Sequence, residues 1–291
     1  MIINMNLLGI DFEDWYHPEL IQRYLTNEKR VPKVIKGLEK ILELLKKTDT
    51  LATFFVVGEL LEYQPEIQDK ILQNGHEIAF HTMYHTSLDS PGFEKKFDLE
   101  LKKFSELTNG NSKGFRAPTF SLNKNSSWAV DLLSNNNYLY DSSIMPAKSS
   151  MYGNPNAEKN PYKITSSSIE QNDPHGKIIE FPLLVTKFLG KTIPAAGGFY
   201  LRFLPLKIIK NAIRNYEKQA IPSTFYVHSW ELTPEYMPDI PLSKKDHFIT
   251  YHNIKNTFSR MDNILHDFEF TSFQNFLDKN KTEKLFKDFA L

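Results

Sequence analysis

The segment from Ala52 to Gly58 is an uninterrupted run of strand-forming residues that ends in a glycine. A strand without a polar face has to be covered on both sides, as strands are inside a parallel sheet. The segment before it, over 34–45, repeats apolar residues at helical spacing with Lys and Glu between them. An amphipathic helix followed by a fully buried strand predicts an α/β fold with a parallel sheet.

The same alternation continues along most of the chain. The remaining strands are predicted at 7–10, 78–80, 138–141, 178–181, 224–228 and 268–270, and the remaining helices at about 65–74, 93–107, 126–133, 206–218, 253–266 and 272–279. In such folds the active site lies where loops leave the carboxyl ends of the strands. Asp11, His81, Arg116 and Asp141 are all expected at these ends.

The 291 residues, of which 41% are hydrophobic, are enough for one large α/β domain. A polar stretch rich in Pro, Asn, Ser and Lys spans about 145–177. Because a strand pattern resumes at Ile178, we interpret this stretch as a long excursion within a single domain over 1–291. Long excursions of this kind often form the rim of a binding site.

Charge and cysteine content exclude several classes of function. Lys+Arg and Asp+Glu are balanced at 35 each, and no basic block is present, so we expect no nucleic-acid partner. The absence of cysteine leaves His and carboxylates as the available metal ligands. The apolar run that ends before Asp11 is too short for a signal-peptide core or a transmembrane segment, so a cytoplasmic location is expected.

His81 and His85 are separated by the spacing that allows two imidazoles to bind one cation. Neutral imidazole suits Zn²⁺ and its transition-metal neighbours. Asp11, Glu13 and Asp14 form a cluster of carboxylates at the end of the first predicted strand, where packing rarely requires them. Two His and one carboxylate leave open coordination positions, at which a water becomes acidic and a carbonyl oxygen is polarised.

The other polar residues at strand ends fit hydrolysis of an amide. A free carboxylate can take the proton of the attacking water, and His228 is suited to protonate the leaving group. Arg116 can orient the carboxylate base and keep it ionised. The pattern therefore indicates a metallohydrolase.

Several segments together resemble the polysaccharide deacetylases that share the NodB homology domain, carbohydrate esterase family 4. Asp11-Phe12-Glu13-Asp14-Trp15 resembles the first motif, His81-Thr82-Met83-Tyr84-His85 the His-(Ser/Thr)-x-x-His metal motif, and Arg116-Ala117-Pro118 the Arg-x-Pro motif. The segments 52–58, 140–143 and 227–231 are similar to further family motifs, and 197–202 is similar to a segment of the branch encoded with exopolysaccharide and surface-glycan genes. All of them occur in the family's order.

The resemblance implies a distorted (β/α) barrel with about seven parallel strands and one divalent metal ion, Zn first, with Co, Ni, Fe or Mn as alternatives. Transferred to this sequence, the metal ligands are Asp14, His81 and His85, and the catalytic residues are Asp11 as base, Arg116 as its partner and His228 as acid. The backbone N–H of Thr119 is expected to bind the oxyanion. Trp230 either stacks on a sugar or packs in the core. Asp141 is expected to orient Arg116 or His228.

The first motif departs from the usual family pattern of two adjacent Asp residues. Here Phe12 and Glu13 separate Asp11 from Asp14, so Glu13 is an alternative to Asp14 as ligand and to Asp11 as base. Asp14 is preferred because Asp is the family's usual ligand. The third motif has Thr119-Phe120 where the family has Tyr, so the shape of the sugar pocket is not transferable.

The resemblance implies an N-deacetylase acting on an amino sugar of a surface-polysaccharide precursor or glycan, either nucleotide-linked or lipid-linked. One alternative is hydrolysis of a non-sugar amide or of a cyclic ureide or imide. Another is a glycan-binding relative without turnover, although such proteins usually lack a ligand or the base, and none is missing here. The oligomeric state is not indicated by the sequence.

Overall fold

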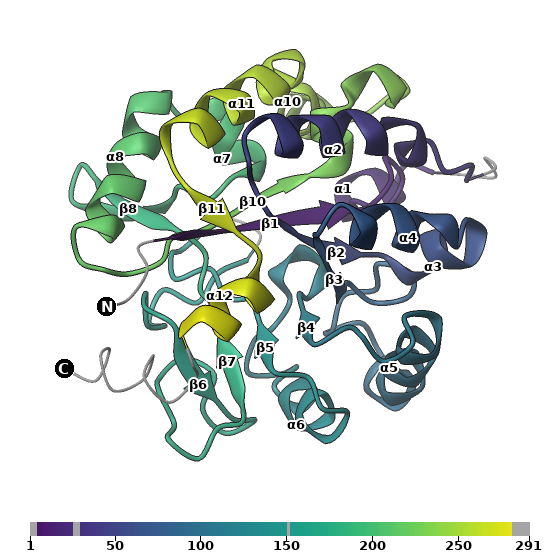
Figure 1. The fold of residues 1–291 in the computed structure, drawn as a ribbon, viewed down its shortest axis with the longest axis vertical. Helices are drawn as coiled ribbons and strands as arrows, with labels where there is room; N and C mark the ends of the chain where they lie inside the picture. Colours follow the sequence, from purple (N-terminus) through teal and green to yellow (C-terminus); the bar gives the residue numbers. More distant parts are fainter. Residues whose placement is uncertain (1–4, 26–29, 150–151, 281–291) are drawn as a thin grey trace.

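The computed structural model describes residues 5–25, 30–149 and 152–280. Within these residues a nine-stranded sheet has the order β10-β1-β2-β3-β4-β5-β7-β6, with β11 also paired to β1 (Figure 1). The strands are β1 (Asn6–Phe12), β2 (Thr53–Val56), β3 (Glu77–Phe80), β4 (Gly114–Phe115), β5 (Tyr140–Asp141), β6 (Tyr162–Ile164), β7 (Ile178–Glu180), β8 (Val185–Phe188), β9 (Lys191–Pro194), β10 (Thr224–His228) and β11 (Phe270–Thr271).

Every neighbouring pair from β10 to β7 is parallel, so seven consecutive strands run in one direction. Only β6 is antiparallel to its neighbour in this sheet. The sheet curls into a half-barrel, which confirms the predicted α/β fold of the distorted-barrel type. Strands β8 and β9 form a separate antiparallel hairpin.

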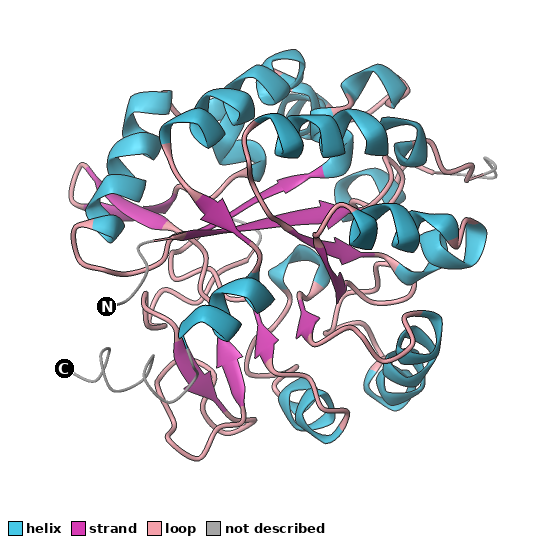
Figure 2. Ribbon diagram, in the orientation of Figure 1, coloured by secondary structure: helices cyan, strands magenta, loops and turns pink. Residues whose placement is uncertain are grey.

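Helices surround the curled sheet on its outer side (Figure 2). The α-helices are α1 (Glu19–Gln22), α2 (Leu38–Lys47), α3 (Gly58–Tyr63), α4 (Glu66–Gln73), α5 (Glu94–Leu107), α6 (Trp128–Asn135), α7 (Gly198–Phe203), α8 (Leu206–Glu217), α9 (Ser229–Leu232), α10 (Lys244–Tyr251), α11 (Thr257–Asp267) and α12 (Phe273–Asn280). The 3₁₀ helices are Val34–Gly37, Pro118–Phe120, Pro234–Tyr236 and Ile254–Asn256. In the described residues no helix is both long and apolar enough to cross a bilayer.

Helix α2 shows why the periodic segments fold as predicted. Ile41 and Leu45, four residues apart, are buried against the sheet, whereas Glu39 and Lys46 on the other face are exposed. The burial of one apolar stripe stabilises the helix far more than its intrinsic propensity does. The α-helical part begins only at Leu38, because the preceding turn is 3₁₀.

Strand β1 is the central element of the site because all seven of its residues are buried and it pairs on both sides. Its last residues place Asp11 beside His228 on β10 and beside Phe55 on β2. Phe80 on β3 is likewise paired with Phe115 on β4, so His81 and Arg116 follow at the same edge. The parallel register therefore brings residues more than 200 positions apart to one end of the sheet.

The sequence patterns did not indicate every element: the β8–β9 hairpin and α10 were not predicted, nor was the structure of two further regions. The polar stretch at 145–177 includes β6, which is only three residues long and pairs antiparallel to β7. Helix α7 begins directly after Gly197, whose φ is +88°. A Cβ at Gly197 would lie 1.5 Å from the carbonyl oxygen of Tyr226, so this close approach of α7 to β10 requires glycine.

Candidate active site

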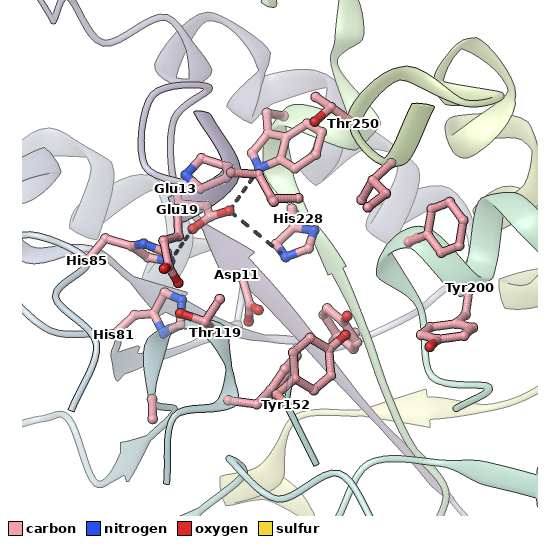
Figure 3. Close-up of a pocket in the computed structure, with 18 of the residues that line it drawn as sticks. Asp11, Glu13, Glu19, His81, His85, Thr119, Tyr152, Tyr200, His228 and Thr250 are labelled. Atoms are coloured by element: carbon pink, nitrogen blue, oxygen red, sulfur yellow. Dashed lines mark hydrogen bonds and ion pairs between the residues drawn. The ribbon is translucent and has the colours of Figure 1, made fainter. Parts of the chain in front are cut away.

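Three side chains at the carboxyl end of the sheet form a group that can hold a metal ion. Ligand atoms of Glu13, His81 and His85 all lie within 4.8 Å of one another, and all three residues are buried. Oε2 of Glu13 lies 2.6 Å from Nε2 of His85. Figure 3 shows the three side chains converging on one side of the cavity.

The histidines of this group are oriented by their surroundings. Nδ1 of His81 lies 2.7 Å from the carbonyl oxygen of Arg116. Because a carbonyl only accepts, Nδ1 carries the hydrogen and the lone pair of Nε2 remains for a ligand. Burial lowers the pKa of His81 to about 4, which keeps the imidazole neutral. His85 has a φ of 54°, an uncommon conformation for a non-glycine residue.

The donor set fits a divalent cation. Oε2 of Glu13 is buried and accepts no hydrogen bond from any described residue, despite its proximity to His85. Although burial opposes its charge, the nearby imidazoles of His85, His228 and His81 lower the pKa of Glu13 below its usual range. A buried carboxylate oxygen without a hydrogen bond is costly unless a cation compensates it. One carboxylate and two neutral imidazoles are typical ligands of Zn²⁺.

Asp14, the preferred third ligand from the sequence, has a different place in the structure. Its Oδ1 accepts a hydrogen bond from the Trp15 N–H at 2.8 Å, and its Oδ2 accepts from the N–H groups of Lys33 and Val34. The carboxylate thus fixes the start of a 3₁₀ helix and is not in the metal-binding group. Glu13, the alternative ligand in the sequence analysis, takes that place beside His81 and His85 in the group that could hold a metal ion.

Arg116 contacts Asp11, as the sequence analysis expected. Its Nη1 donates to Oδ1 of Asp11 at 2.6 Å, and both side chains are almost completely buried. Its Nε and Nη2 donate to the carbonyl and hydroxyl oxygens of Ser142, each at 2.9 Å. The guanidinium carbon lies 4.0 Å from the ring centre of Phe55. These contacts leave Arg116 a single orientation, in which Asp11 faces the cavity.

His228 lies at the other side of the cavity from the two metal-binding histidines (Figure 3). Its Nδ1 is 2.7 Å from Oε2 of Glu231, and its Nε2 is 3.9 Å from Oε1 of Glu13. Burial favours the neutral ring, but the carboxylates of Glu231, Glu13 and Asp11 together outweigh it and raise the pKa of His228 to about 9. Sequence reasoning missed Glu231, although it lies only three residues after His228.

Asp141 does not contact Arg116 or His228 with its carboxylate. It accepts hydrogen bonds from the hydroxyl and the N–H of Ser143, at 2.6 and 3.2 Å. The Ser143 hydroxyl oxygen in turn accepts from the N–H of Ala117 at 2.8 Å. Asp141 therefore supports the backbone beside Arg116 through Ser143, and its carboxylate has no hydrogen bond to His228 among the described residues.

Trp230 and Thr119 both line the cavity, but in different ways. The ring of Trp230 stacks on His228, with ring centres 5.2 Å apart, and its Nε1 donates to Oε1 of Glu13 at 2.8 Å. Trp230 is only 6% exposed, so its face is not free to stack on a sugar. Thr119 has a φ of 54°, and its N–H donates to no described acceptor, whereas that of Phe120 bonds to Ala117. This N–H remains available to a substrate oxygen.

The cavity has a volume of about 200 Å³ and aromatic walls. Rings from distant parts of the chain form these walls: Phe120, Tyr152, Phe199, Tyr200 and Tyr226. Thr119 and Tyr152 also border an adjoining open groove of about 1180 Å³, lined by more polar residues. A small catalytic cavity that opens into a wide polar groove fits a reacting group on a larger molecule.

Two family descriptions match most of the chain. Residues 32–137 match "Polysaccharide deacetylase", and residues 142–278 match "Domain of unknown function (DUF3473)". Over residues 32–137 the chain is therefore similar to polysaccharide deacetylases. The first match contains His81, His85 and Arg116, whereas His228 and Glu231 lie in the second.

Similar proteins include a peptidoglycan-N-acetylglucosamine deacetylase and a chitooligosaccharide deacetylase. Over 81 residues the chain is 35% identical to a peptidoglycan-N-acetylglucosamine deacetylase of Bacillus cereus, covering 27% of this chain and 38% of the relative. Over 48 residues it is 42% identical to a chitooligosaccharide deacetylase of Bradyrhizobium sp., covering 16% and 22%. The matched segments thus span less than two fifths of these relatives' length.

The fold as a whole matches a solved structure over nearly its full length. A putative polysaccharide deacetylase from Mycobacterium smegmatis superposes with a TM-score of 0.60, covering 98% of this chain and 93% of that one. The sequences are 16% identical, so this likeness concerns the fold alone. It confirms the distorted barrel predicted from the sequence.

Proposed function

We propose that this protein is a metal-dependent hydrolase that removes the N-acetyl group from an amino sugar of a surface-polysaccharide precursor or glycan. The observation that carries the proposal is one cavity containing the metal-binding group of Glu13, His81 and His85 together with Asp11 and His228. Hydrolysis of an amide needs a proton acceptor for water and a proton donor for the amine, and this cavity offers both.

Glu13, His81 and His85 would hold a divalent cation, which would supply Lewis acidity for activating a water molecule and the acetyl carbonyl. Asp11 accepts the proton of the attacking water, and Arg116 keeps that carboxylate ionised and correctly oriented. The free N–H of Thr119 stabilises the developing oxyanion. His228 gives the proton on Nε2 to the departing amine.

A sugar substrate is supported by the walls of the site. Aromatic rings provide faces for the apolar side of a sugar ring, and the adjoining groove has room and polar side chains for neighbouring sugar or linker groups. Two relatives are named as deacetylases of peptidoglycan N-acetylglucosamine and of chitooligosaccharides, which supports a glycan substrate. The nucleotide-linked or lipid-linked form of the substrate and the cytoplasmic location stay predictions.

The test combines metal analysis with acetate release. The purified protein is expected to hold one divalent ion per chain and to release acetate from at least one of three substrate sets: N-acetylated oligosaccharides, nucleotide sugars and lipid-linked glycans. His81→Ala should lose both metal and activity, whereas His266→Ala, at an exposed position on α11, should keep both.

Three results would contradict the proposal. A wild-type protein that binds no divalent ion would remove its basis. Ring-opened products from cyclic ureides or imides, without acetate from any sugar, would favour the alternative hydrolase. Tight glycan binding by the metal-loaded protein with no product at all would indicate a binding protein without turnover.

A further inference from the structure

The segment described as a domain of unknown function contributes one whole side of the cavity. Residues 142–278 contain His228, and they also contain α7 and α10, whose residues Phe199, Tyr200, Ile249 and Thr250 line the cavity. The metal-binding histidines and Arg116 come from the other matched segment, residues 32–137. Asp11 and Glu13 precede both segments, so the site combines residues from the chain before residue 32, from 32–137 and from 142–278.

Glu231 holds the ring of His228 in one orientation. His228 is the N-cap of α9, and Oε2 of Glu231 accepts from both its backbone N–H at 3.2 Å and its Nδ1 at 2.7 Å. Because a carboxylate only accepts, Nδ1 carries a hydrogen in every protonation state of the ring. Nε2 is left as the nitrogen that faces Glu13 and the cavity.

Arg202 on α7 holds Glu231 in turn. Its Nε donates to Oε1 of Glu231 at 2.6 Å, Nη1 donates to the carbonyl of His252 at 2.7 Å, and Nη2 donates to the carbonyl of Ile249 at 2.8 Å. Arg202 is 3% exposed and Glu231 is fully buried. The rigid guanidinium satisfies three acceptors at fixed angles, which a lysine cannot do.

We propose that Glu231 and Arg202 are positioning residues for His228, so that the segment of unknown function forms the acid side of the active site. This rests on the proposed function in one respect, namely that His228 donates a proton to the leaving group. The resemblance had assigned the orienting task to Asp141, but that carboxylate bonds to Ser143 instead.

A buried ion pair can also contribute to stability alone. The test therefore needs a readout that a loss of stability by itself would not alter. Two acetyl compounds provide it. An N-acetylated amino sugar has an amine leaving group that must be protonated, whereas 4-nitrophenyl acetate has a leaving group that departs without a proton. Loss of a positioned acid therefore slows the first reaction and spares the second.

The variants are Glu231→Gln and Arg202→Lys in the metal-loaded protein. Glu231→Gln removes the negative charge. Its amide N–H₂ then faces either the guanidinium of Arg202, which only donates, or Nδ1 of His228, which has to lose its proton to accept. We expect kcat for the amide to fall about 100-fold or more, the range for loss of a general acid, while KM, metal content and ester hydrolysis change less than about threefold. Arg202→Lys should show the same selectivity with a smaller loss.

Arg260→Lys is the matched control. Arg260 also ties α7 to its surroundings, by donating to the carbonyl oxygens of Leu201 and Leu204, but it does not contact Glu231. Any effect of loosening α7 should appear in this variant too. Equal losses on amide and ester, or equal losses in Arg260→Lys and Arg202→Lys, would overturn the proposal.

Two further measurements keep the test decisive. If Glu231 acts through His228, the double variant His228→Ala/Glu231→Gln should hydrolyse the amide about as fast as His228→Ala alone. Additive losses from the two substitutions would contradict this role of Glu231. Nitrogen–proton correlation spectra of the His228 ring should show a hydrogen-bonded Nδ1 proton in the wild type that is lost in Glu231→Gln. The spectra test the positioning role even if the wild type hydrolyses no amide. Absence of amide hydrolysis would contradict the proposed function but not the positioning role.

Discussion

Oε2 of Glu13 lies 2.6 Å from Nε2 of His85, although 72 positions separate the two residues in the chain. The neighbouring carboxylate, Asp14, is turned away and bonded to backbone N–H groups. Two adjacent acidic residues thus have different surroundings: Glu13 faces the histidines, and Asp14 accepts from the backbone.

Replacing each carboxylate by alanine should separate their roles. Loss of a residue that only hydrogen-bonds to a metal ligand typically weakens metal binding about 10- to 100-fold. Glu13→Ala removes a ligand itself, so it should weaken binding of the divalent ion by more than that. Asp14→Ala should leave metal affinity within about threefold but lower the free energy of unfolding by about 1–2 kcal/mol, as loss of a cap does. Metal titration and urea unfolding measure the two effects; metal loss in Asp14→Ala alone would restore the original ligand assignment.

The buried ion pair between Asp11 and Arg116 should be costly to break. Arg116→Met leaves Asp11 buried without its partner, so we expect a loss of about 3–5 kcal/mol in the free energy of unfolding. Lys40→Met breaks a pair with Glu235 that is 39% and 44% exposed, and should cost about 0–1 kcal/mol. Urea denaturation of both variants is the measurement, and equal costs would contradict the reasoning.

Asp11→Asn tests the base directly. The amide keeps a hydrogen bond from Arg116 but cannot take a proton, so kcat for deacetylation should fall about 100-fold or more while the metal content is unchanged. Acetate release and metal analysis on the same preparation measure the two quantities. Full activity in Asp11→Asn would transfer the role of base to another group.

Gly9 makes room for the guanidinium of Arg116. A Cβ at Gly9 would lie 2.6 Å from Nη1 of Arg116, so Gly9→Ala should displace the group that orients Asp11 and reduce kcat. Crowding of this kind costs about 1–3 kcal/mol of stability. Gly37→Ala creates a similar contact, 2.4 Å to Cγ2 of Thr233, away from the cavity. It should lose stability but keep kcat, and a comparable loss of kcat there would indicate a general packing effect.

The stability of the protein should depend on pH through His76. Burial lowers the pKa of His76 to about 4, whereas the unfolded value is about 6.5. Between these values the unfolded chain binds more protons than the folded one, so stability is fully present above pH 6.5 and falls as the pH drops toward 4. The loss is about 3 kcal/mol at pH 4. Urea unfolding of His76→Gln should show a flatter profile over this window, and an unchanged profile would contradict the assignment.

Local patterns in the sequence were enough to predict an α/β fold with a parallel sheet, and the family resemblance implied the distorted barrel. Strand 52–58 and helix 34–45 are visible because burial on two faces, or on one stripe, imposes a period on neighbouring residues. The short strand β6 escaped because three residues carry no measurable period. The four-residue spacing of His81 and His85 is likewise local, so it too was visible in the sequence.

What the sequence determined by itself was the kind of chemistry: histidines and carboxylates placed at the ends of strands in a parallel sheet. Only the tertiary structure decided which carboxylate faces the histidines, since Glu13 and Asp14 are adjacent and differ by the contacts each finds with 33–34, His85 and Trp230. It also decided that Glu231 and Arg202, 29 positions apart, support His228. Such choices depend on side-chain directions and long-range packing, which no local spacing contains.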